Sequence, residues 1–421
     1  MINNLKTIHT DVCILGAGPG GAATALYLSQ LGIPSVVVDK AVFPRDKICG
    51  DGLSGKVTSI LNRIDPAIAE RLRQKAYKTN SWGVRFVAPN RIGLDIPLKL
   101  DYENQMNKPV GFVCRRMDFD NFLVEEMKLR KDIQLIEGVS LEVYQLENNH
   151  YRLASKNADG LEVYAKLVIV ANGAHSKFTK EIAGFTMEPD HHCAGVRAYY
   201  KDVSGCHHHN FIELHFIKKT LPGYFWIFPL PNGGANVGLG MLSSEISKRK
   251  VNLRKLLEDT VANDPIIKER FSNATIEGNI EGYGLPLGSK KRKLHGERYL
   301  LVGDAAHLID PFTGEGIGNA MYAGYYAAKR TAEALKENNF SANFLSTYDE
   351  DINRVLGPEL RVSHKLQKML KYPWLFNFLN RLGARNKELK ELMTCMFNDI
   401  DLRYKFRDPK FYLRLLFNRQ S

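Results

Sequence analysis

Three glycines near the start of the chain have a spacing that lets backbone amides surround a pyrophosphate. Gly16, Gly18 and Gly21 form a GxGxxG pattern between the apolar run 12–15 and an Ala-rich stretch typical of a helix. The first glycine permits a tight turn, the second lets N–H groups approach the anion, and the third lets helix and strand pack closely. The positive end of the helix then faces the phosphates. We therefore expect an adenine dinucleotide, either FAD or NAD, to bind at this turn.

An acidic residue stands where such sites hold a ribose. Asp39 ends the next apolar run of the chain and is followed by Lys40. The carboxylate can accept hydrogen bonds from ribose hydroxyls, and its charge disfavours a 2′-phosphate. We expect Asp39 and the adjoining Lys40 to belong to the cofactor site.

A second glycine-rich segment, GDAAHLIDPFTGEGIGNA, lies far along the chain at 303–320. Its Asp304 follows an apolar run, where the carboxylate can hold a polyol hydroxyl. The stretch from Gly314 through Gly316 and Ile317 begins a long Ala-rich helix, whose N–H donors and positive end would face an electron-rich ring. A reduced flavin carries negative charge on its ring, whereas NAD needs no such second site. The pair of segments therefore favours FAD.

Over most of residues 10–340 these motifs resemble those of the FAD-dependent oxidoreductases with the para-hydroxybenzoate hydroxylase fold. The segment 303–320 is similar to the GD motif of that family nearly letter for letter. This resemblance implies that Asp304 contacts the FAD ribitol and that the stretch from Pro311 to Gly318 borders the isoalloxazine ring.

Two further positions match motifs of the same family. Arg116, in RRMDFDNFL, resembles the arginine that precedes a helix, which implies a contact to the ribose or phosphate side of FAD. The segment ANGAHS resembles the middle motif, in which an acid usually precedes the glycine. Here Asn172 replaces that acid and Gly173 is retained, so the resemblance implies a weaker contact at this point.

Two segments resemble the geranylgeranyl reductase family more narrowly. FPRDKICGDGL has an Arg, Lys and Cys-Gly-x-Gly-Leu pattern, and YFWIFP followed by GGANVGLG is similar to strands of the substrate domain. The first resemblance implies residues near the flavin, namely Arg45, Cys49, Gly50 and Gly52. The second implies a cavity wall formed by Tyr224, Trp226, Phe228 and Pro229. Flavin halogenases carry a related WxWxIP, and the different residues at the first and fifth positions argue against halogenation.

Two of these assignments have plain alternatives. A thiol between Lys47 and a glycine-rich turn can have a lowered pKa and donate a proton, which makes Cys49 a candidate catalytic residue. A small buried apolar side chain is the other interpretation of Cys49. Without the resemblance, an aromatic stripe such as 224–228 is more often core than a substrate wall.

The order of strand and helix patterns predicts an α/β protein with a discontinuous cofactor domain. Apolar runs around an Ala-rich helix indicate a parallel, Rossmann-like FAD-binding sheet, assigned to 1–80, 111–184 and 286–345. Alternating and hairpin patterns predict an inserted, mostly antiparallel β-rich substrate domain at 81–110 and 185–285. The remainder, 346–421, is expected to be helical.

Composition limits the environment and the partners. The chain has 421 residues and a formal charge of +12, and from Lys371 to Ser421 it carries 11 basic against 5 acidic side chains. The stretch RDPKFYLRLLFNRQS predicts either an interfacial helix, with peripheral membrane association, or a helix packed on the fold. Dispersed cysteines, and the absence of a signal-like or membrane-spanning apolar run, favour the cytoplasm.

Other partners are not expected. No nucleic-acid-binding motif accompanies the basic charge. The histidine-rich segments 191–193 and 206–209 lack the convergent spacing of a zinc site, because successive residues of a strand point to opposite faces. We therefore expect no metal.

Together these features predict an FAD-dependent oxidoreductase with an apolar cavity for an isoprenoid or other lipid-like substrate. Hydride transfer from reduced flavin N5 to a C=C bond is the favoured chemistry. A flavin-dependent hydroxylase of an apolar or aromatic substrate would share all the FAD residues and is the main alternative, and a prenyl or lipid carrier without flavin chemistry is a more distant one. Because a second dinucleotide fingerprint is lacking, NAD(P)H would act as a transient reductant, or an electron-transfer protein would reduce the flavin.

Overall fold

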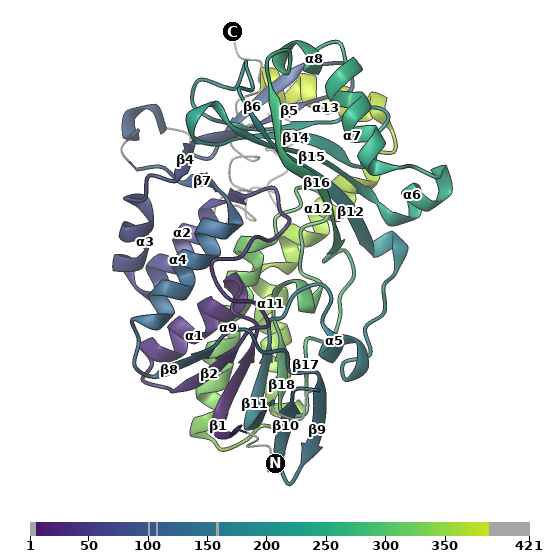
Figure 1. Ribbon diagram of the computed structural model, residues 1–421. Coiled ribbons are helices and arrows are strands. Elements are labelled where there is room, and N and C mark those ends of the chain that lie inside the picture. Colours follow the sequence, from purple (N-terminus) through teal and green to yellow (C-terminus); the bar gives the residue numbers. More distant parts are fainter. Residues whose placement is uncertain (1–5, 100–101, 107, 157–159, 387–421) are drawn as a thin grey trace.

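The computed structural model describes residues 6–99, 102–106, 108–156 and 160–386. Two sheets dominate it, one at the bottom and one at the top of Figure 1, and helices of the C-terminal part run between them. Each sheet has its own buried apolar cluster. The α/β class predicted from the sequence is confirmed.

The lower sheet is built from segments that are distant in the sequence. Its central strands are parallel, and each central strand ends in a run of buried apolar residues, as a sheet covered on both faces requires. A hairpin of β9 (Val143–Glu147) and β10 (His150–Ala154) adds to β11. The spatial order of the main strands is β17 (His295–Gly296), β18 (Tyr299–Leu301), β11 (Leu161–Val170), β1 (Lys6–Leu15), β2 (Ser35–Val38) and β8 (Ile133–Ile136).

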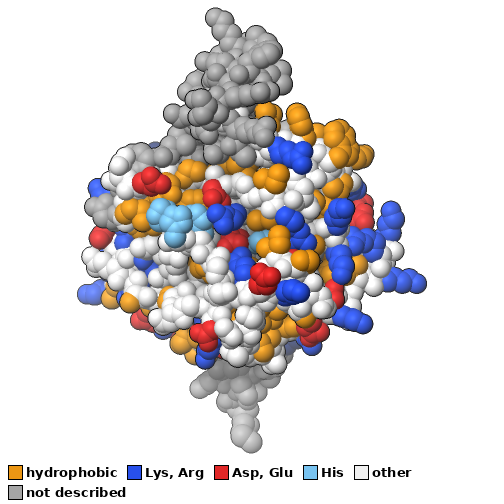
Figure 2. Space-filling model, turned by 90° about the horizontal axis from the view of Figure 1, so that it is seen from above, with side chains coloured by type: hydrophobic (Ala, Val, Ile, Leu, Met, Phe, Trp, Pro, Cys, Tyr) orange, Lys and Arg blue, Asp and Glu red, His pale blue; other side chains and the backbone are white. Residues whose placement is uncertain are grey.

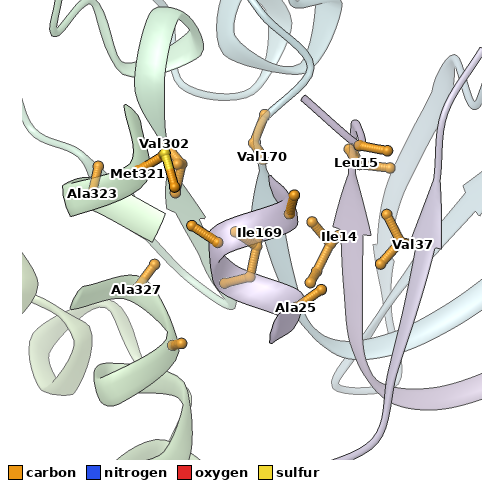
Figure 3. Packing of buried hydrophobic residues seen from close by; sticks show 14 of the residues in the cluster. Ile14, Leu15, Ala25, Val37, Ile169, Val170, Val302, Met321, Ala323 and Ala327 are labelled. Carbon is orange, nitrogen blue, oxygen red and sulfur yellow. The ribbon is translucent and has the colours of Figure 1, made fainter. Parts of the chain in front are cut away.

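Helix α1 (Pro19–Gln30) and helix α9 (Ile317–Lys336) pack closely against each other beside this sheet. Figure 3 shows Ala25 of α1 next to Ile14 of β1, and Met321 of α9 next to Val302, which follows β18. The approach depends on small residues, because a Cβ built on Gly324 would lie 2.3 Å from the carbonyl oxygen of Gly20. The two glycine-rich segments of the sequence therefore lie side by side at the ends of these helices.

The upper sheet is mixed but mostly antiparallel. The turn 231–233 joins β14 to β15 as the expected hairpin. The strand order is β16 (Thr275–Pro286), β12 (His192–Lys201), β15 (Ala235–Leu242), β14 (Tyr224–Pro229), β13 (Ile212–His215), β5 (Gly83–Val87) and β6 (Gly93–Pro97). A small third sheet has the order β3 (Gly52–Leu53), β7 (Gly111–Cys114) and β4 (Lys78–Ser81).

One expectation about the inserted region was incomplete. The stretch 243–270, predicted only as part of a mostly β region, forms α6 (Ser243–Arg249), α7 (Leu253–Asn263) and α8 (Ile267–Arg270). Helix α7 begins at Asn252, whose side chain accepts a hydrogen bond from Lys255 N at 3.0 Å. The capping residue and the helical spacing of leucines in NLRKLLEDTV were the signal for this helix.

The remaining helices cover the lower sheet and connect it to the upper one. In Figure 1, α2 and α4 lie to one side, while α11 and α12 run through the centre of the molecule. Their bounds are α2 (Gly55–Ile64), α3 (Pro66–Arg73), α4 (Arg116–Lys128), α5 (Lys177–Glu181), α10 (Ala342–Leu345), α11 (Thr347–Val355), α12 (Gly357–Met369) and α13 (Pro373–Arg385). The domain limits assigned from the sequence stay predictions.

Candidate cofactor and substrate site

The turn between β1 and α1 has the geometry of an anion cradle. Gly16 has a φ of +98°, and a Cβ at this position would lie 2.5 Å from the carbonyl oxygen of Ala171. Gly18, the N-cap of α1, faces open space, because a Cβ there would meet only Arg45 at 3.9 Å. A Cβ on Gly21 would lie 1.9 Å from the Gly16 oxygen, so helix and turn are in contact. An anion can therefore approach the backbone at Gly18.

The acid after β2 organises this turn. Asp39 Oδ2 accepts a hydrogen bond from Ala17 N at 2.7 Å, and Oδ1 accepts one from Ala41 N at 2.8 Å. Each oxygen keeps a lone pair for a ribose hydroxyl. Lys40 beside it is exposed. The sequence predicted a ribose-binding role for Asp39, and the structure adds that this residue fixes the glycine turn.

A buried acceptor without a partner lies against the same turn. Asn172 Oδ1 is buried and has no hydrogen-bond partner within the described residues, and its Cα lies 2.9 Å from the position of a Cβ on Gly16. Gly173 follows with a φ of +85°. An orphaned buried acceptor costs free energy unless a ligand or water supplies a donor. These residues fit the hydroxyl-rich adenosine end of FAD.

Asp120, which sequence reasoning missed, anchors two of the predicted arginines. Arg116 binds Asp120 through two hydrogen bonds of 2.7 Å, and Arg45 reaches the same carboxylate at 2.6 Å. Because Asp120 is fully buried, both guanidinium groups are held in place. The (i, i+4) spacing of Arg116 and Asp120 on α4 was the available signal.

The second glycine-rich segment forms a loop that leads into α9. Asp304 accepts a hydrogen bond from Lys47 Nζ at 3.0 Å, which joins this loop to the segment after β2. Gly314 has a φ of +73°, and a Cβ there would lie 2.7 Å from the hydroxyl of Tyr224. Glu315 accepts a hydrogen bond from Gly318 N at 2.7 Å at the start of α9. The loop is thus placed between the cofactor turn and the upper sheet.

A cavity of about 190 Å³ lies between this loop and the upper sheet. Predicted site residues that line it are Cys49, Gly50, Gly52, Arg116, Asp304, Gly314, Gly316, Ile317, Tyr224, Trp226 and Phe228. Predicted residues outside its lining are Gly16, Gly18, Gly21, Asp39, Lys40, Arg45, Asn172, Gly173, Pro229 and Pro311. Pro19, the first residue of α1, also lines the cavity, so the two groups adjoin.

Strand alternation explains which aromatic residues face the cavity. Tyr224, Trp226 and Phe228 have the same parity along β14 and line it, whereas Phe225 packs in the cluster on the other face. Pro229 shares the parity of Phe225 and is not among the residues that line the cavity, so its place in the wall stays a prediction. Trp226 is oriented by a hydrogen bond of 2.9 Å from Nε1 to Asn236 Oδ1. Further apolar lining comes from Val84, Leu98, Ile212 and Leu214.

The prediction that the Cys49 thiol has a lowered pKa is wrong. Burial raises the pKa of this thiol, and the neighbouring charge of Arg116 offsets only part of that effect. The thiol is therefore protonated at neutral pH. Cys49 lines the cavity, where it remains a candidate for donating a proton or for shaping the pocket.

An unpredicted carboxyl group stands two residues further on. Asp51 is fully buried and lines the cavity, with a φ of +68°. Its Oδ2 accepts hydrogen bonds of 2.8 Å from Tyr199 Oη and from Asn236 Nδ2. Burial raises the pKa of Asp51 to about 6. No local pattern could reveal this, because both partners come from strands of the upper sheet.

The glycine turn, the polar residues around it and the adjoining cavity define an FAD-dependent oxidoreductase. The family model described as FAD binding domain matches residues 9–357, and the chain belongs to this family. The expectation that FAD is the cofactor and the assignment to an enzyme class are confirmed. The groups of this chain that fit FAD are the open turn at Gly18, the unpaired Oδ1 atom of Asn172 and the carboxylate of Asp304.

Curated relatives agree with the narrower resemblance. A digeranylgeranylglycerophospholipid reductase from Thermoplasma acidophilum is 29% identical over 344 residues, covering 81% of this chain and 82% of its own. A menaquinone reductase from Mycobacterium tuberculosis is 27% identical over 328 residues, covering 76% of each. The predicted resemblance to the geranylgeranyl reductase family is confirmed.

Solved structures share the fold. A geranylgeranyl bacteriochlorophyll reductase-like protein from Thermoplasma acidophilum superposes with a TM-score of 0.76 at 25% identity, covering 90% of this chain and 92% of that one. A flavin-dependent brominase superposes with a TM-score of 0.75 at 19% identity, covering 93% and 94%. The second likeness concerns the fold alone.

Two other expectations concern features outside this site. Within the described residues, no helix is long and apolar enough to cross a membrane, and no group of three or more metal-ligating side chains converges. The basic aromatic stretch 407–421, expected to be interfacial or packed, lies outside the described residues.

Proposed function

We propose that this protein is an FAD-dependent reductase of C=C bonds in a hydrophobic, isoprenoid-like substrate. The observation that carries this proposal is the cavity wall, in which Tyr224, Trp226 and Phe228 face the loop from Gly314 to Ile317. This wall continues into apolar residues of β5 and β13, so an extended apolar chain gains free energy by leaving water there. The names of the two curated relatives, which are reductases, support the same substrate class.

Reduced FAD, when bound, supplies a hydride, and the protein does the rest. We infer that Gly16, Gly18 and Asp39 hold the adenosine and pyrophosphate end, with Asn172 donating or accepting at a hydroxyl. Asp304, fixed by Lys47, would hold the ribitol. The backbone from Gly314 to Ile317 would then place the ring against the cavity, and the aromatic wall would exclude water from the reacting carbons.

The electron donor is part of the proposal. We infer that a nicotinamide dinucleotide visits the site transiently or that an electron-transfer protein reduces the flavin, because the glycine turn between β1 and α1 is taken by FAD. Reduction of the flavin by NADH, by NADPH or by neither, followed in the visible spectrum, separates these two sources.

Product analysis tests the proposed function. Photoreduced holoenzyme is incubated without oxygen with menaquinone or with digeranylgeranylglycerophospholipid, and the lipids are examined by mass spectrometry. We expect a lipid that is heavier by two hydrogens in its isoprenoid chain, together with reappearance of oxidised flavin. A product that gains oxygen, formed only after air is admitted, would instead establish the hydroxylase. Unchanged lipid and unchanged flavin would support the carrier.

We also infer that the protein meets its substrate at a lipid surface. Figure 2, the view from above, shows hydrophobic side chains and Lys and Arg side chains on the surface, with Asp and Glu side chains among them. On α13, Trp374 is 70% exposed and Phe378 is 55% exposed, and Tyr372, one residue before the helix, is 58% exposed. We expect the protein to cosediment with anionic vesicles and to do so less as the salt concentration rises. Absence of binding at low salt would contradict the inferred contact with a lipid surface.

A further inference from the structure

Alkene reduction needs a proton as well as a hydride, and Asp51 occupies the position from which one can be delivered. Its backbone runs along the aromatic wall, because a Cβ on Gly50 or on Gly52 would lie 3.0 or 3.2 Å from the Cε2 atom of Phe228. The left-handed backbone of Asp51 places its fully buried carboxyl group in the lining of the cavity. The acid therefore belongs to the same wall as the apolar residues that would hold a substrate.

The side chain of Asp51 is held by two neutral donors. Tyr199 Oη and Asn236 Nδ2 both bind Oδ2 at 2.8 Å. Oδ1 receives only a long hydrogen bond of 3.3 Å from Arg116 N. Asn236 also donates to Cys49 O at 2.7 Å and accepts from Trp226, so one amide links the acid to the aromatic wall. Oδ1 therefore has the weaker hydrogen bond and is the oxygen left to carry a proton.

Other carboxyl groups in the cavity lining are committed to other contacts. Asp304 is paired with Lys47 at 3.0 Å. Glu315 accepts from the start of α9, and Glu359 is paired with Lys56 at 2.6 Å. Within the described lining, Asp51 and Glu315 are thus the carboxyl groups that no lysine or arginine side chain binds directly. Of these two, Glu315 is taken up by the backbone amide of Gly318, whereas Asp51 stands in the aromatic wall.

We propose that Asp51 donates the proton that completes reduction of the C=C bond, an inference that rests on the proposed function. One alkene carbon receives the hydride that leaves reduced FAD with its electron pair. The other carbon receives the proton of Asp51, whose O–H bonding pair stays on the carboxylate. The alkene gains two electrons and reduced FAD loses two, and water returns a proton to Asp51. The step is balanced without another reactant.

The surroundings of Asp51 allow it to be protonated near neutral pH. Burial raises its pKa to about 6, against the opposing effects of Asn236, Tyr199, Arg197 and Arg116. Arg115, Cys49 and Cys114 are the other titratable groups that interact with it. Burial also raises the pKa of Tyr199, so this phenol stays protonated and donates to Asp51. The protonated fraction of Asp51 falls about tenfold per pH unit above its pKa.

The substitution Asp51→Asn tests the assignment, because asparagine has nearly the same shape and tolerates a left-handed backbone. Reoxidation of photoreduced flavin by digeranylgeranylglycerophospholipid, which has no quinone ring to accept the electrons, is followed in the absence of oxygen. We expect the wild-type rate to fall as pH rises above about 6, and the variant rate to be at least tenfold lower and independent of pH. Flavin content should be unchanged. An unchanged rate and pH profile in the variant would overturn the proposal.

Two further measurements separate donation from a structural role. Tyr199→Phe removes a hydrogen bond to the ionised carboxylate, so the pH profile should shift to higher pH, whereas Cys49→Ala should retain the wild-type profile. Infrared spectra of the apoprotein should contain a protonated carboxyl band that disappears near pH 6 and is missing from Asp51→Asn. Absence of that band, or loss of the pH dependence in Cys49→Ala, contradicts the assignment. A wild-type enzyme that reduces neither lipid probe refutes the proposed function, and this inference with it.

Discussion

Two glycines of the opening turn differ in what a methyl group would meet. At Gly16 the backbone is left-handed and a Cβ would lie 2.5 Å from Ala171 O, whereas at Gly18 the φ of −69° suits any residue and a Cβ meets nothing closer than 3.9 Å. We expect Gly16→Ala to lower the free energy of unfolding of the apoprotein by about 3 kcal/mol. Gly18→Ala should leave it unchanged within about 0.5 kcal/mol.

For FAD binding we expect Gly18→Ala to have a large effect, although this substitution leaves the stability of the apoprotein nearly unchanged. A methyl group on Gly18 would stand where the pyrophosphate must approach, so the dissociation constant of FAD should rise at least about tenfold. Urea denaturation of the apoproteins and fluorescence titration with FAD measure the two quantities. A Gly18→Ala protein that binds FAD as tightly as the wild type would show that the phosphates lie elsewhere.

Single residues were predicted from the sequence when their signal was local. The GxGxxG turn and the 303–320 segment carry their meaning in their own spacing. Asp51 was missed because Tyr199 and Asn236, on which its role depends, are brought close only by folding. Asp120 had a local signal in its spacing from Arg116, whereas its contact with Arg45 depends on the fold. Pro229 was predicted together with its neighbours and lies outside the cavity lining, because alternate residues of a strand face opposite ways.

At the scale of elements, α2, α9 and α12 meet at one buried lysine. Lys56 of α2 is 6% exposed and binds Glu359 of α12 at 2.6 Å and Asn319 of α9 at 2.9 Å. Glu315 lies nearby, and burial raises the pKa of both carboxyl groups. The lysine thus compensates negative charge that would otherwise be buried alone.

We therefore expect Lys56→Met to lower the free energy of unfolding by about 3 kcal/mol at pH 7. The deficit should shrink as pH falls toward 5, because protonation neutralises the carboxyl groups left behind. Lys56→Met with Glu359→Gln should recover part of the loss. The matched control is Lys219→Met, which removes an exposed partner of Asp259 and should leave the melting temperature unchanged. Equal losses in Lys56→Met at pH 5 and pH 7 would contradict this account.

Helices and strands could be predicted from the sequence where their apolar patterns extend over many residues. The strands of the lower sheet and the helix after Ile317 follow from continuous apolar runs and Ala-rich spacing. The helices at 243–270 were missed because a hairpin-rich context dominated the interpretation, although Asn252 and the leucine spacing marked α7.

At the scale of the whole molecule, function depends on how two sheets from interleaved segments meet. The lower sheet presents the turn at Gly18 and the loop at Gly314, and the upper sheet presents the aromatic wall. The order of strand and helix patterns in the sequence predicted a cofactor domain and a β-rich domain. How the two are placed relative to each other depends on contacts such as that of Lys47 with Asp304, which the sequence does not reveal. A trough that starts at the glycine turn and ends at an apolar wall is what the proposed reduction requires.

A crystal structure with FAD bound tests that placement most directly. We expect the pyrophosphate at Gly18, the ribitol at Asp304, and the isoalloxazine ring between the loop at Gly314 and Cys49, with Trp226 and Phe228 beyond it. A ring that lies outside the cavity, or one separated from Asp51 by the aromatic wall, would contradict both the site and the reaction proposed for it.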